Sequence, residues 1–570
     1  MNNQFIKNII LKMSEDQKIG ALLTLGFAGT MVRPHIHDMI LKYHCGGLRL
    51  TPIARLFGSY VDPKSGKTIL DVTDTKGFKK GGLPPAVTAS QYSQMLDELA
   101  ALAASRPLGL PLHFSFDQEG GTSADFNFGG VNIFTKPMGI RCAGDPNLAY
   151  AVAKAVARQA KAVGFGWIHS PVLDVNSEPM NPEIYTRAYS DVAQEVAEYA
   201  IKTCEGFKEE KFIATGKHFP GRGDSAVDAH FEMPTINVDR QTMMNRELLP
   251  YRELIKRDLL PSIMIAHSIY PAFDEVDIAT VSKPILTGLL RDTLGFEGVI
   301  TTDSMTMGGV AIRYGVANAC AMALEAGADL VLMKAENSLV GEVFAKIKEF
   351  VTSGRISQSE LDKKVYRVLK VKYDNGLFSP LAKEDAETVL QDPGIIALSK
   401  NLAKRSVLVH KNRDLPLQKT GKLLVIEQIN KTPNNFYWHP GILYKNCLKY
   451  YTNIDYLETA YTFDESDKER ILQNIDKYDS VIITNFFIRG NISNNEFIEE
   501  LLVKYNNAAS PKIVVVTNTP YPISVPKNCP NLIVSFATSP DNMEVCAGVV
   551  FGGINAEGFW PIAWKETNLL

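Results

Sequence analysis

The fold is decided by the stretch Phe212-Ile-Ala-Thr-Gly-Lys217-His218-Phe219-Pro220-Gly221-Arg222-Gly223-Asp224. Its first part, Phe212–Lys217, is a short apolar run with the length of a buried strand, and a Lys-His pair and a loop rich in Pro and Gly follow it. A buried strand that delivers polar side chains to its carboxyl end is typical of parallel α/β folds, where active sites form at that end.

The same pattern recurs from about Gly20 to Phe378, where short apolar segments alternate with helical ones. The predicted strands are Gly46–Thr51, Leu110–Asp117, Gly166–Val172, Phe212–Lys217, Ser262–His267, Gly298–Asp303 and Ala328–Met333. Regular alternation of strands and helices predicts a parallel sheet, and the number of repeats favours a (β/α)₈ TIM-like barrel over an open sheet.

The chain is predicted to form two domains of the α/β class. Residues 1–378 form the barrel, with a polar insertion at 53–88 that is either a lid over the pocket or a disordered segment. Residues 379–397 are a linker, and residues 398–570 form a smaller α/β domain, an αβα sandwich. The predicted strands of this second domain are Ser406–His410, Lys422–Glu427, Ser480–Thr484, Lys512–Thr517 and Asn531–Ser535. It contains no Gly-rich phosphate-binding motif, so no nucleotide site is predicted there.

Composition excludes several classes of protein. The 570 residues are 45% hydrophobic and 22% charged, with a net charge of −3, which is ordinary for a soluble globular protein and gives no reason to expect a nucleic-acid partner. The seven cysteines are scattered, which argues against a disulfide framework or a zinc site. No apolar run has the length of a signal-peptide core or a membrane span, so we expect a cytoplasmic protein with no membrane partner. The oligomeric state stays open.

Polar residues end most of the predicted strands. These residues are Asp117, Asp174, Lys217, His218, His267 and Asp303. One polar residue at a strand end means little, but strand ends in a barrel share one rim, so together these residues predict a site.

The loop after Lys217 also carries Asp228-Ala-His230. A carboxylate two residues before an imidazole can hold it in one tautomer and raise its basicity, which suits a general acid/base. The alternative is an ordinary loop histidine. The Gly-rich loop before the pair favours the catalytic interpretation, because a mobile loop can bring an acid/base to a bound substrate.

Three further residues have two interpretations each. Asp303 is either a nucleophile or a helix N-cap. Asp117, in Asp117-Gln-Glu-Gly-Gly, either accepts paired sugar hydroxyls or belongs to a turn. Arg187 is either a clamp for a hydroxyl or carboxylate, or a structural arginine.

Taken in order, these motifs resemble glycoside hydrolase family 3, and in particular its two-domain β-N-acetylglucosaminidase branch. The resemblance is carried by Asp117-Gln-Glu-Gly-Gly, Asp174-Val-Asn, Lys217-His218-Phe-Pro-Gly, Asp228-Ala-His230 and Thr302-Asp303-Ser-Met. Residues Ala403–Val409 and Val550–Pro561 look like parts of the family's second domain.

The resemblance implies a role for each matched residue. Asp303 is the nucleophile, His230 the acid/base and Asp228 its orienting partner. The residues implied to bind substrate are Asp117, Arg187, Lys217, His218, Asp174 and His267. A retaining glycosidase needs only a nucleophile and a proton donor, so no cofactor or metal is expected. Asp303 must stay ionised, and we expect Lys217 or Arg187 to lower its pKa.

The chain also departs from the family pattern. Thr122-Ser-Ala-Asp125 follows the Asp-Gln-Glu-Gly-Gly motif where the family carries Arg-Val, Arg222 replaces a usual histidine, and Arg187-Ala-Tyr-Ser190 replaces Arg-Ser-Phe-Gly. These changes affect the expected substrate more than the expected reaction.

The resemblance thus implies a retaining exo-β-N-acetylglucosaminidase (β-N-acetylhexosaminidase) that acts on small soluble glycosides, such as fragments from peptidoglycan recycling. One alternative is a phosphorylase, because a neutral imidazole repels phosphate less than a carboxylate does. Another is a β-glucosidase-like specificity. A third, a catalytically inactive sugar-binding protein, predicts the loss of Asp303 or His230, and both are present.

Overall fold

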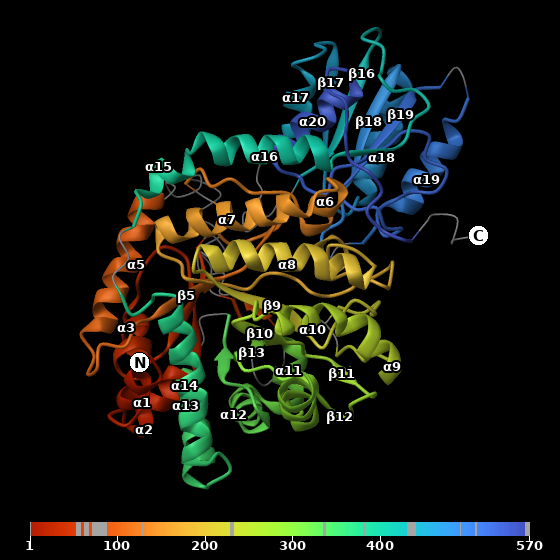
Figure 1. The fold of residues 1–570 in the computed structure, drawn as a ribbon. Helices are drawn as coiled ribbons and strands as arrows, with labels where there is room; N and C mark the ends of the chain where they lie inside the picture. The colour runs from red at the N-terminus through yellow and green to blue at the C-terminus, as the bar shows by residue number, and fades with distance from the viewer. Residues whose placement is uncertain are drawn as a thin grey trace.

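The computed structural model describes residues 2–52, 59–61, 68–70, 88–127, 129–228, 233–334, 338–379, 383–429, 441–490, 492–507 and 510–564. A barrel surrounded by helices forms the larger body, and a second sheet domain lies beyond helices α6 and α16 (Figure 1). No described helix combines the length and the apolar character needed to traverse a bilayer.

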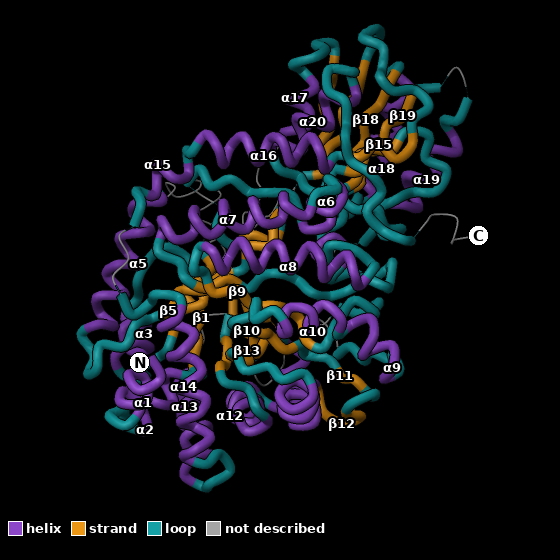
Figure 2. Tube along the Cα trace, viewed as in Figure 1, coloured by secondary structure: helices purple, strands orange, loops and turns teal. Residues whose placement is uncertain are grey.

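Eight parallel strands close the barrel in the order β1-β14-β13-β10-β9-β8-β5-β2. Their bounds are β1 Leu23–Ala28, β2 Gly47–Thr51, β5 His113–Phe116, β8 Trp167–Ile168, β9 Ile213–Phe219, β10 Ser262–Ile265, β13 Val299–Ser304 and β14 Leu330–Leu332. This confirms the predicted TIM-like barrel. Helices surround the strands (Figure 2), so the strands are buried on both faces and read as apolar runs.

The helices of the barrel domain have these bounds: α1 Asn2–Ile10, α2 Glu15–Ala21, α3 Pro34–Leu41, α5 Ala89–Ala104, α6 Pro137–Cys142, α7 Pro146–Val163, α8 Ala193–Glu209, α9 Arg240–Thr242, α10 Leu249–Lys256, α11 Gly308–Tyr314, α12 Val316–Ala326, α13 Val340–Thr352 and α14 Gln358–Asp374. Shorter or irregular turns are η1 Tyr185–Arg187, η2 Met243–Glu247, η3 Ala279–Val281 and η4 Pro284–Thr293.

Helix α14 shows why these segments fold as they do. Ser357 and Glu360 form a capping box at its start, which satisfies two backbone N–H groups that the helix cannot. Leu361, Val365 and Val368 recur at helical spacing and are buried in the barrel core. A cap of this kind contributes about 1 kcal/mol to helix stability.

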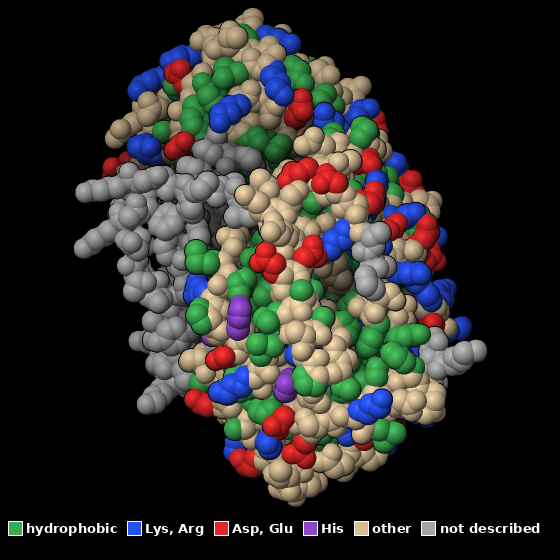
Figure 3. Space-filling view, turned by 90° about the vertical axis from the view of Figure 1, so that its left-hand side faces the viewer, with side chains coloured by type: hydrophobic (Ala, Val, Ile, Leu, Met, Phe, Trp, Pro, Cys, Tyr) green, Lys and Arg blue, Asp and Glu red, His purple; other side chains and the backbone are tan. Residues whose placement is uncertain are grey.

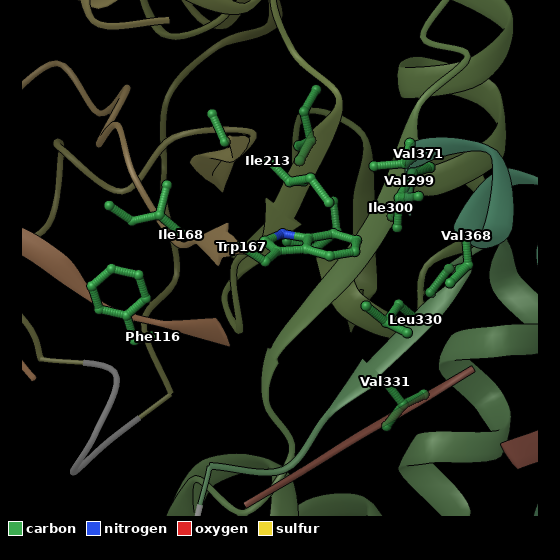
Figure 4. Packing of buried hydrophobic residues seen from close by; sticks show 14 of the residues in the cluster. Phe116, Trp167, Ile168, Ile213, Val299, Ile300, Leu330, Val331, Val368 and Val371 are labelled. Carbon is green, nitrogen blue, oxygen red and sulfur yellow. The ribbon is translucent and has the colours of Figure 1, made fainter. Parts of the chain in front are cut away.

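The barrel interior is filled by side chains. Trp167 lies at its centre among apolar residues of β5, β9, β13 and β14 (Figure 4). Its indole N–H donates to Thr215 Oγ1 at 2.7 Å, so the one polar atom of the ring is satisfied. This packing fixes the positions of the strand ends that carry the rim residues.

Strand β1 was not predicted. Its apolar residues continue without a break from Ile19 and Leu22, so the pattern could not separate the strand from helix α2. The 53–88 insertion therefore follows the second strand and not the first. Within it the structure describes β3 (Ser59–Val61) and β4 (Thr68–Leu70), which pair antiparallel, and Thr88, which caps α5. The lid or disordered interpretation concerns residues outside the described ones.

The second domain contains a six-stranded sheet in the order β15-β20-β19-β18-β16-β17, in which β15 alone pairs antiparallel. Its strands are β15 Leu408–Lys411, β16 Leu423–Gln428, β17 Ile454–Thr459, β18 Ser480–Asn485, β19 Lys512–Thr517 and β20 Leu532–Val534, and its helices are α17 Ile442–Cys447, α18 Glu465–Asn474, α19 Asn495–Lys504 and α20 Pro540–Val550, with the turn η5 Ile475–Lys477. Alternate residues of β16 enter two separate cores, one against α17 and α20 and the other against α18 and α19. This is the expected αβα sandwich, although β17 was not predicted.

Two helices, α15 (Ala386–Leu390) and α16 (Pro393–Ser406), cover the predicted linker and the predicted start of the second domain. Helix α16 contributes Ile395 to the barrel core and Ala403 to a core of the second domain. A further apolar cluster joins the two domains, and in it the rings of Tyr185 and Phe487 meet edge to face at 5.4 Å. The second domain is therefore packed directly against the barrel.

The described part of the face in Figure 3 carries no dominant charge. Acidic and basic side chains are interspersed over the face shown in Figure 3. All seven cysteines are buried as free thiols.

Candidate active site

Asp117 and Lys217 meet at the carboxyl end of the barrel. Lys217, in β9, donates from Nζ to Asp117 Oδ1 at 2.7 Å, across from the end of β5. Arg49, which is buried within β2, binds the other carboxylate oxygen of Asp117 and also binds Asp125. Burial alone would raise the pKa of Asp117, but the charges of Lys217 and Arg49 hold this pKa well below its ordinary value. Asp117 is therefore a fixed carboxylate that can accept hydrogen bonds from the hydroxyl groups of a ligand.

Glu119 and Arg187 form a second, adjacent pair. The Arg187 guanidinium donates to both Glu119 oxygens, at 2.7 and 3.0 Å, and Lys217 Nζ lies 2.5 Å from Glu119 Oε1. Despite the burial of Glu119, Arg187 and Lys217 lower its pKa. Lys217 is thus shared by Asp117 and Glu119, which couples the ends of β5 and β9.

His218 joins this group to Asp174. Its Nδ1 lies 2.7 Å from Asp174 Oδ2, and its Nε2 lies 3.4 Å from Arg187 Nη2. Asp174 is fully buried and also accepts the backbone N–H of Arg222 at 2.7 Å. Asp174 therefore orients His218 and the start of the Gly-rich loop from behind the rim.

Asp303 lies near the end of β13, and its side chain is 17% exposed. Its Oδ1 accepts the Ser304 N–H at 2.7 Å, and its Oδ2 lies 3.5 Å from Arg222 Nη1. Helix α11 has Met307 at its N-cap position, so Asp303 is not a helix cap. Among the described residues, Arg222 is the cation paired with Asp303. Lys217 and Arg187, which we expected there, contact Asp117 and Glu119.

Arg222 is itself held by Glu183, which comes from the loop before η1. The Arg222 guanidinium forms an ion pair with the buried Glu183 carboxylate, and Arg187 Nη1 lies 3.8 Å from the same Glu183 oxygen. The residue that replaces a usual histidine therefore belongs to a buried charge network that ends at Asp303.

The second domain contributes Arg489 to this network. Arg489, from the loop after β18, places its Nε 3.9 Å from Asp228 Oδ2 and its Nη1 4.0 Å from Glu183 Oε1. The second domain therefore contributes to the site, because one of its side chains reaches the carboxylates Asp228 and Glu183.

His267 lies below the rim. Its Nδ1 is 2.7 Å from Thr280 Oγ1, and its Nε2 is 3.1 Å from the Ser304 carbonyl oxygen. Both ring nitrogens therefore face protein atoms and support the end of β13. The predicted contact between His267 and substrate stays a prediction.

His230 lies outside the described residues, so its predicted role also stays a prediction. Its predicted partner Asp228 is described and is 8% exposed. The segment after Asp117 forms a hairpin of β6 (Gln118–Gly120) and β7 (Ser123–Ala124), whose turn glycine Gly121 has a positive φ of 52°. The turn and the binding interpretation of this motif are therefore compatible.

Several residues of the site were not predicted. They are Arg49, Glu119, Asp125, Glu183, Lys334 and Arg489. Arg49 had a usable signal, because a charged residue inside the apolar segment Gly47-Leu-Arg-Leu-Thr51 needs a buried partner. Among the described residues, no three His, Cys, Asp or Glu side chains are grouped so that they could hold a metal ion.

The chain matches the Glycosyl hydrolase family 3 N terminal domain over residues 16–371, a range that contains the whole rim of the barrel. The chain belongs to glycosyl hydrolase family 3. The resemblance drawn from its motifs is thereby confirmed.

Two family 3 relatives are named for activity on N-acetylated sugars. The chain is 29% identical over 357 residues to beta-hexosaminidase A of Pseudoalteromonas piscicida, covering 59% of each protein. It is 28% identical over 350 residues to a beta-N-acetylglucosaminidase/beta-glucosidase of Cellulomonas fimi, covering 59% of this chain and 60% of that protein. The matched part thus spans about 60% of the length of these relatives.

A solved family 3 structure extends the likeness to both domains. The β-N-acetylglucosaminidase of Paenibacillus sp. str. FPU-7 aligns with a TM-score of 0.83 and 25% identity, covering 96% of this chain and 99% of that one. A beta-glucoside phosphorylase also shares the fold, with a TM-score of 0.77 and 19% identity.

Proposed function

We propose that this protein is a retaining exo-β-N-acetylglucosaminidase that cleaves terminal β-linked GlcNAc from small soluble glycosides. The observation that carries the proposal is the position of Asp303 at the end of β13. Its partly exposed carboxylate has Arg222 at 3.5 Å, on the rim that also carries the Asp117, Lys217 and Arg187 network. The names of the relatives from Pseudoalteromonas and Cellulomonas support the choice of sugar.

In this mechanism Asp303 attacks C1 of the sugar while His230 gives a proton to the departing glycosidic oxygen. The C1–O bond to the aglycone breaks, and an ester between C1 and Asp303 forms. His230 then takes a proton from water, whose oxygen attacks C1, and the electron pair of the ester bond returns to Asp303. Asp228 holds the imidazole in the tautomer that both steps need.

The remaining rim residues bind and orient the sugar in this proposal. Asp117 is ionised and 22% exposed, so its free lone pairs can accept hydroxyl protons. Arg187 and His218 are fixed by Glu119 and Asp174, so they need little reorganisation when substrate binds.

A panel of aryl β-glycosides tests the sugar preference. We expect the GlcNAc glycoside to be hydrolysed faster than the GalNAc, Glc, Gal and Xyl glycosides, with the first sugar product in the β configuration by NMR. Faster turnover of the glucoside would favour the β-glucosidase alternative, and an α product would exclude retention.

The acid/base role is tested by His230→Ala. Loss of the proton donor should slow substrates with poor leaving groups about 10²- to 10⁴-fold, but activated aryl glycosides much less, because a good leaving group needs no proton. Equal losses on both kinds of substrate would contradict the role.

We also propose that the enzyme works in the cytoplasm on recycled peptidoglycan fragments. The composition and the small-glycoside specificity motivate this proposal. Cell fractionation with detection of the native protein, together with hydrolysis of purified muropeptides, tests it; a secreted protein or inert muropeptides would contradict it.

A further inference from the structure

Two cations at the site are not used by the proposed mechanism. Lys334 follows β14 on the barrel rim, and its Nζ lies 3.5 Å from Asp117 Oδ2. Arg489 comes from the second domain and lies beside Asp228 and Glu183. Their side chains are 39% and 38% exposed, far more than those of the other cations of the rim.

The hydrogen-bond donors of these two side chains are available to a ligand. Within the part of the chain that the structure describes, neither Lys334 Nζ nor the Arg489 guanidinium makes a hydrogen bond, and their nearest carboxylate oxygens lie at 3.5 to 4.0 Å. By contrast, the side-chain nitrogens of Lys217 and Arg187 lie 2.5 to 3.0 Å from carboxylate oxygens of Asp117 and Glu119, to which they donate. Lys334 and Arg489 can therefore donate to a ligand without breaking a protein hydrogen bond.

The neighbouring carboxylates do not need these two cations. Asp117 is already bound by Lys217 and Arg49. Glu183 is already bound by Arg222 and approached by Arg187. Lys334 and Arg489 thus add positive charge beside two carboxylates, Asp117 and Glu183, that have other partners.

Burial affects both cations. It lowers the pKa of Lys334, although Asp125 and Asp117 oppose this effect, and the charges of Arg49 and Arg489 make smaller contributions in the same direction. Burial also lowers the pKa of Arg489, with a further contribution from Arg187. Cations kept in a region that disfavours positive charge are stabilised by an anionic ligand.

We propose that Lys334 and Arg489 form a subsite for an oxyanion, a carboxylate or phosphate, that lies beside the sugar during the reaction. Half of this subsite comes from each domain. The planar guanidinium suits a bidentate oxyanion, and the ammonium adds a point charge. The proposal rests on the proposed glucosaminidase function and narrows its substrate to glycosides that meet an anion at this place.

The anion has two possible sources. It is either a carboxylate carried by the aglycone or free phosphate that replaces water as the acceptor. In the second case a phosphate oxygen forms a bond to C1, the ester bond between C1 and Asp303 breaks, and its electron pair returns to the carboxylate. The product is a sugar 1-phosphate, and no oxidant or reductant is needed.

A matched pair of disaccharides tests the first source. GlcNAc β-linked to O4 of glucuronic acid is compared with GlcNAc β-linked to O4 of glucose, which replaces the carboxylate by a hydroxymethyl group. We expect kcat/KM to favour the acid by about tenfold, and the ratio to fall to about one in Arg489→Ala and Lys334→Ala, because one charge-assisted pair is worth roughly this factor. Arg489→Lys should keep part of the preference, whereas Arg489→Gln should not.

The second source is tested with inorganic phosphate and the neutral 4-nitrophenyl glycoside. Formation of GlcNAc 1-phosphate that rises with phosphate concentration, and that Arg489→Ala reduces, identifies phosphate as the anion. Arg405→Ala is the matched control for both experiments. Arg405 also bridges the two domains, with a hydrogen bond to the Ala143 carbonyl oxygen at 3.1 Å and an ion pair with Asp145 at 3.7 Å; within the described ranges it pairs with no rim residue.

The outcomes separate this proposal from the proposed function. An acid preference or sugar phosphate formation that both variants reduce, and that Arg405→Ala leaves intact, supports the subsite. Hydrolysis of the neutral glycosides with neither anion effect overturns the subsite and leaves the glucosaminidase function standing. Absence of hydrolysis of every β-GlcNAc substrate overturns the function itself.

Discussion

Strands end in polar residues both at the barrel rim and at the carboxyl edge of the second sheet, but these residues make different contacts in the two places. In the barrel, parallel strands deliver Asp117, Lys217 and Asp303 to a rim where these side chains bind one another or stay partly exposed. In the second sheet, β16 ends in Glu427 and Gln428, and β18 ends in Asn485. By position alone, both edges qualify as sites.

The polar groups of the second edge are used in hydrogen bonds within the domain, most of them to the backbone. Glu427 accepts the N–H groups of Leu443 and Tyr444 at 3.1 and 3.2 Å. Gln428 donates to the carbonyl oxygens of Tyr461 and Phe486, and Asn485 donates to that of Ser524. A polar strand end therefore indicates a ligand site when some of its hydrogen-bond donors and acceptors are not used in bonds within the protein.

The strongest test of the barrel rim is Asp303→Ala. Removal of the nucleophile should lower kcat by about 10⁴-fold or more, because the covalent step has no substitute. Turnover of 4-nitrophenyl β-N-acetylglucosaminide measures the loss, and added azide should restore part of it as the glycosyl azide. Retention of most of the activity, with unchanged thermal unfolding, would assign the nucleophile elsewhere.

An intermediate effect is expected for Arg187→Lys. Lysine keeps the charge but loses the two parallel bonds to Glu119, so kcat/KM should fall about 10- to 100-fold through misplacement of the sugar. The control is Arg158→Lys, an arginine on the outside of the barrel that pairs with Glu384 and Asp392. This variant should change stability by less than about 0.5 kcal/mol and leave activity intact. Similar losses in both variants would show that the rim arginine acts only through stability.

The smallest effect is expected in the second sheet, from Glu427→Gln. Burial raises the pKa of Glu427 to about 7 from 4.5, partly offset by the N–H groups at the start of α17. A raised carboxyl pKa gives stability that is present below the unfolded value and is lost as the pH rises through the folded value. From pH 5 to pH 8 the variant should therefore gain stability relative to the parent, by about 1 to 3 kcal/mol.

Urea unfolding at the two pH values measures this gain, and kcat should stay unchanged. Glu465→Gln is the control, because Glu465 is on the same domain with a side chain that is 84% exposed. Parallel stability curves for Glu427→Gln and its parent would contradict the buried titration.

Most of the barrel could be predicted because its strands are buried on both faces and end in polar residues. Strand β1 was missed because its apolar residues continue those of α2, so no boundary marks where the helix ends. Strand β17 was missed because it is an edge strand with half-exposed positions, which carries a weaker apolar signal.

Site residues could be predicted where a few neighbouring residues carry the signal. They could not be predicted where the site depends on contacts between residues far apart in the sequence. Asp117, Lys217 and Asp303 each end an apolar run, and this pattern is visible in a few residues. Glu183 and Arg489 meet across more than three hundred positions of sequence, and only the packing of the second domain against the barrel brings them together. Lys334 follows an apolar run as Asp303 does and could have been found by the same argument.

The last described segment of the chain, which returns from the second domain to the barrel, places two tryptophans at the junction of the domains. Ser190 Oγ donates to the Pro561 carbonyl oxygen, and Asp191 accepts the N–H groups of Ala563 and Trp564. Trp560 lies in the same junction and donates from its indole to the Trp564 carbonyl oxygen at 2.8 Å. In a variant that keeps Trp560 and Trp564 and carries phenylalanine at Trp167 and Trp438, fluorescence should therefore report the separation of the domains.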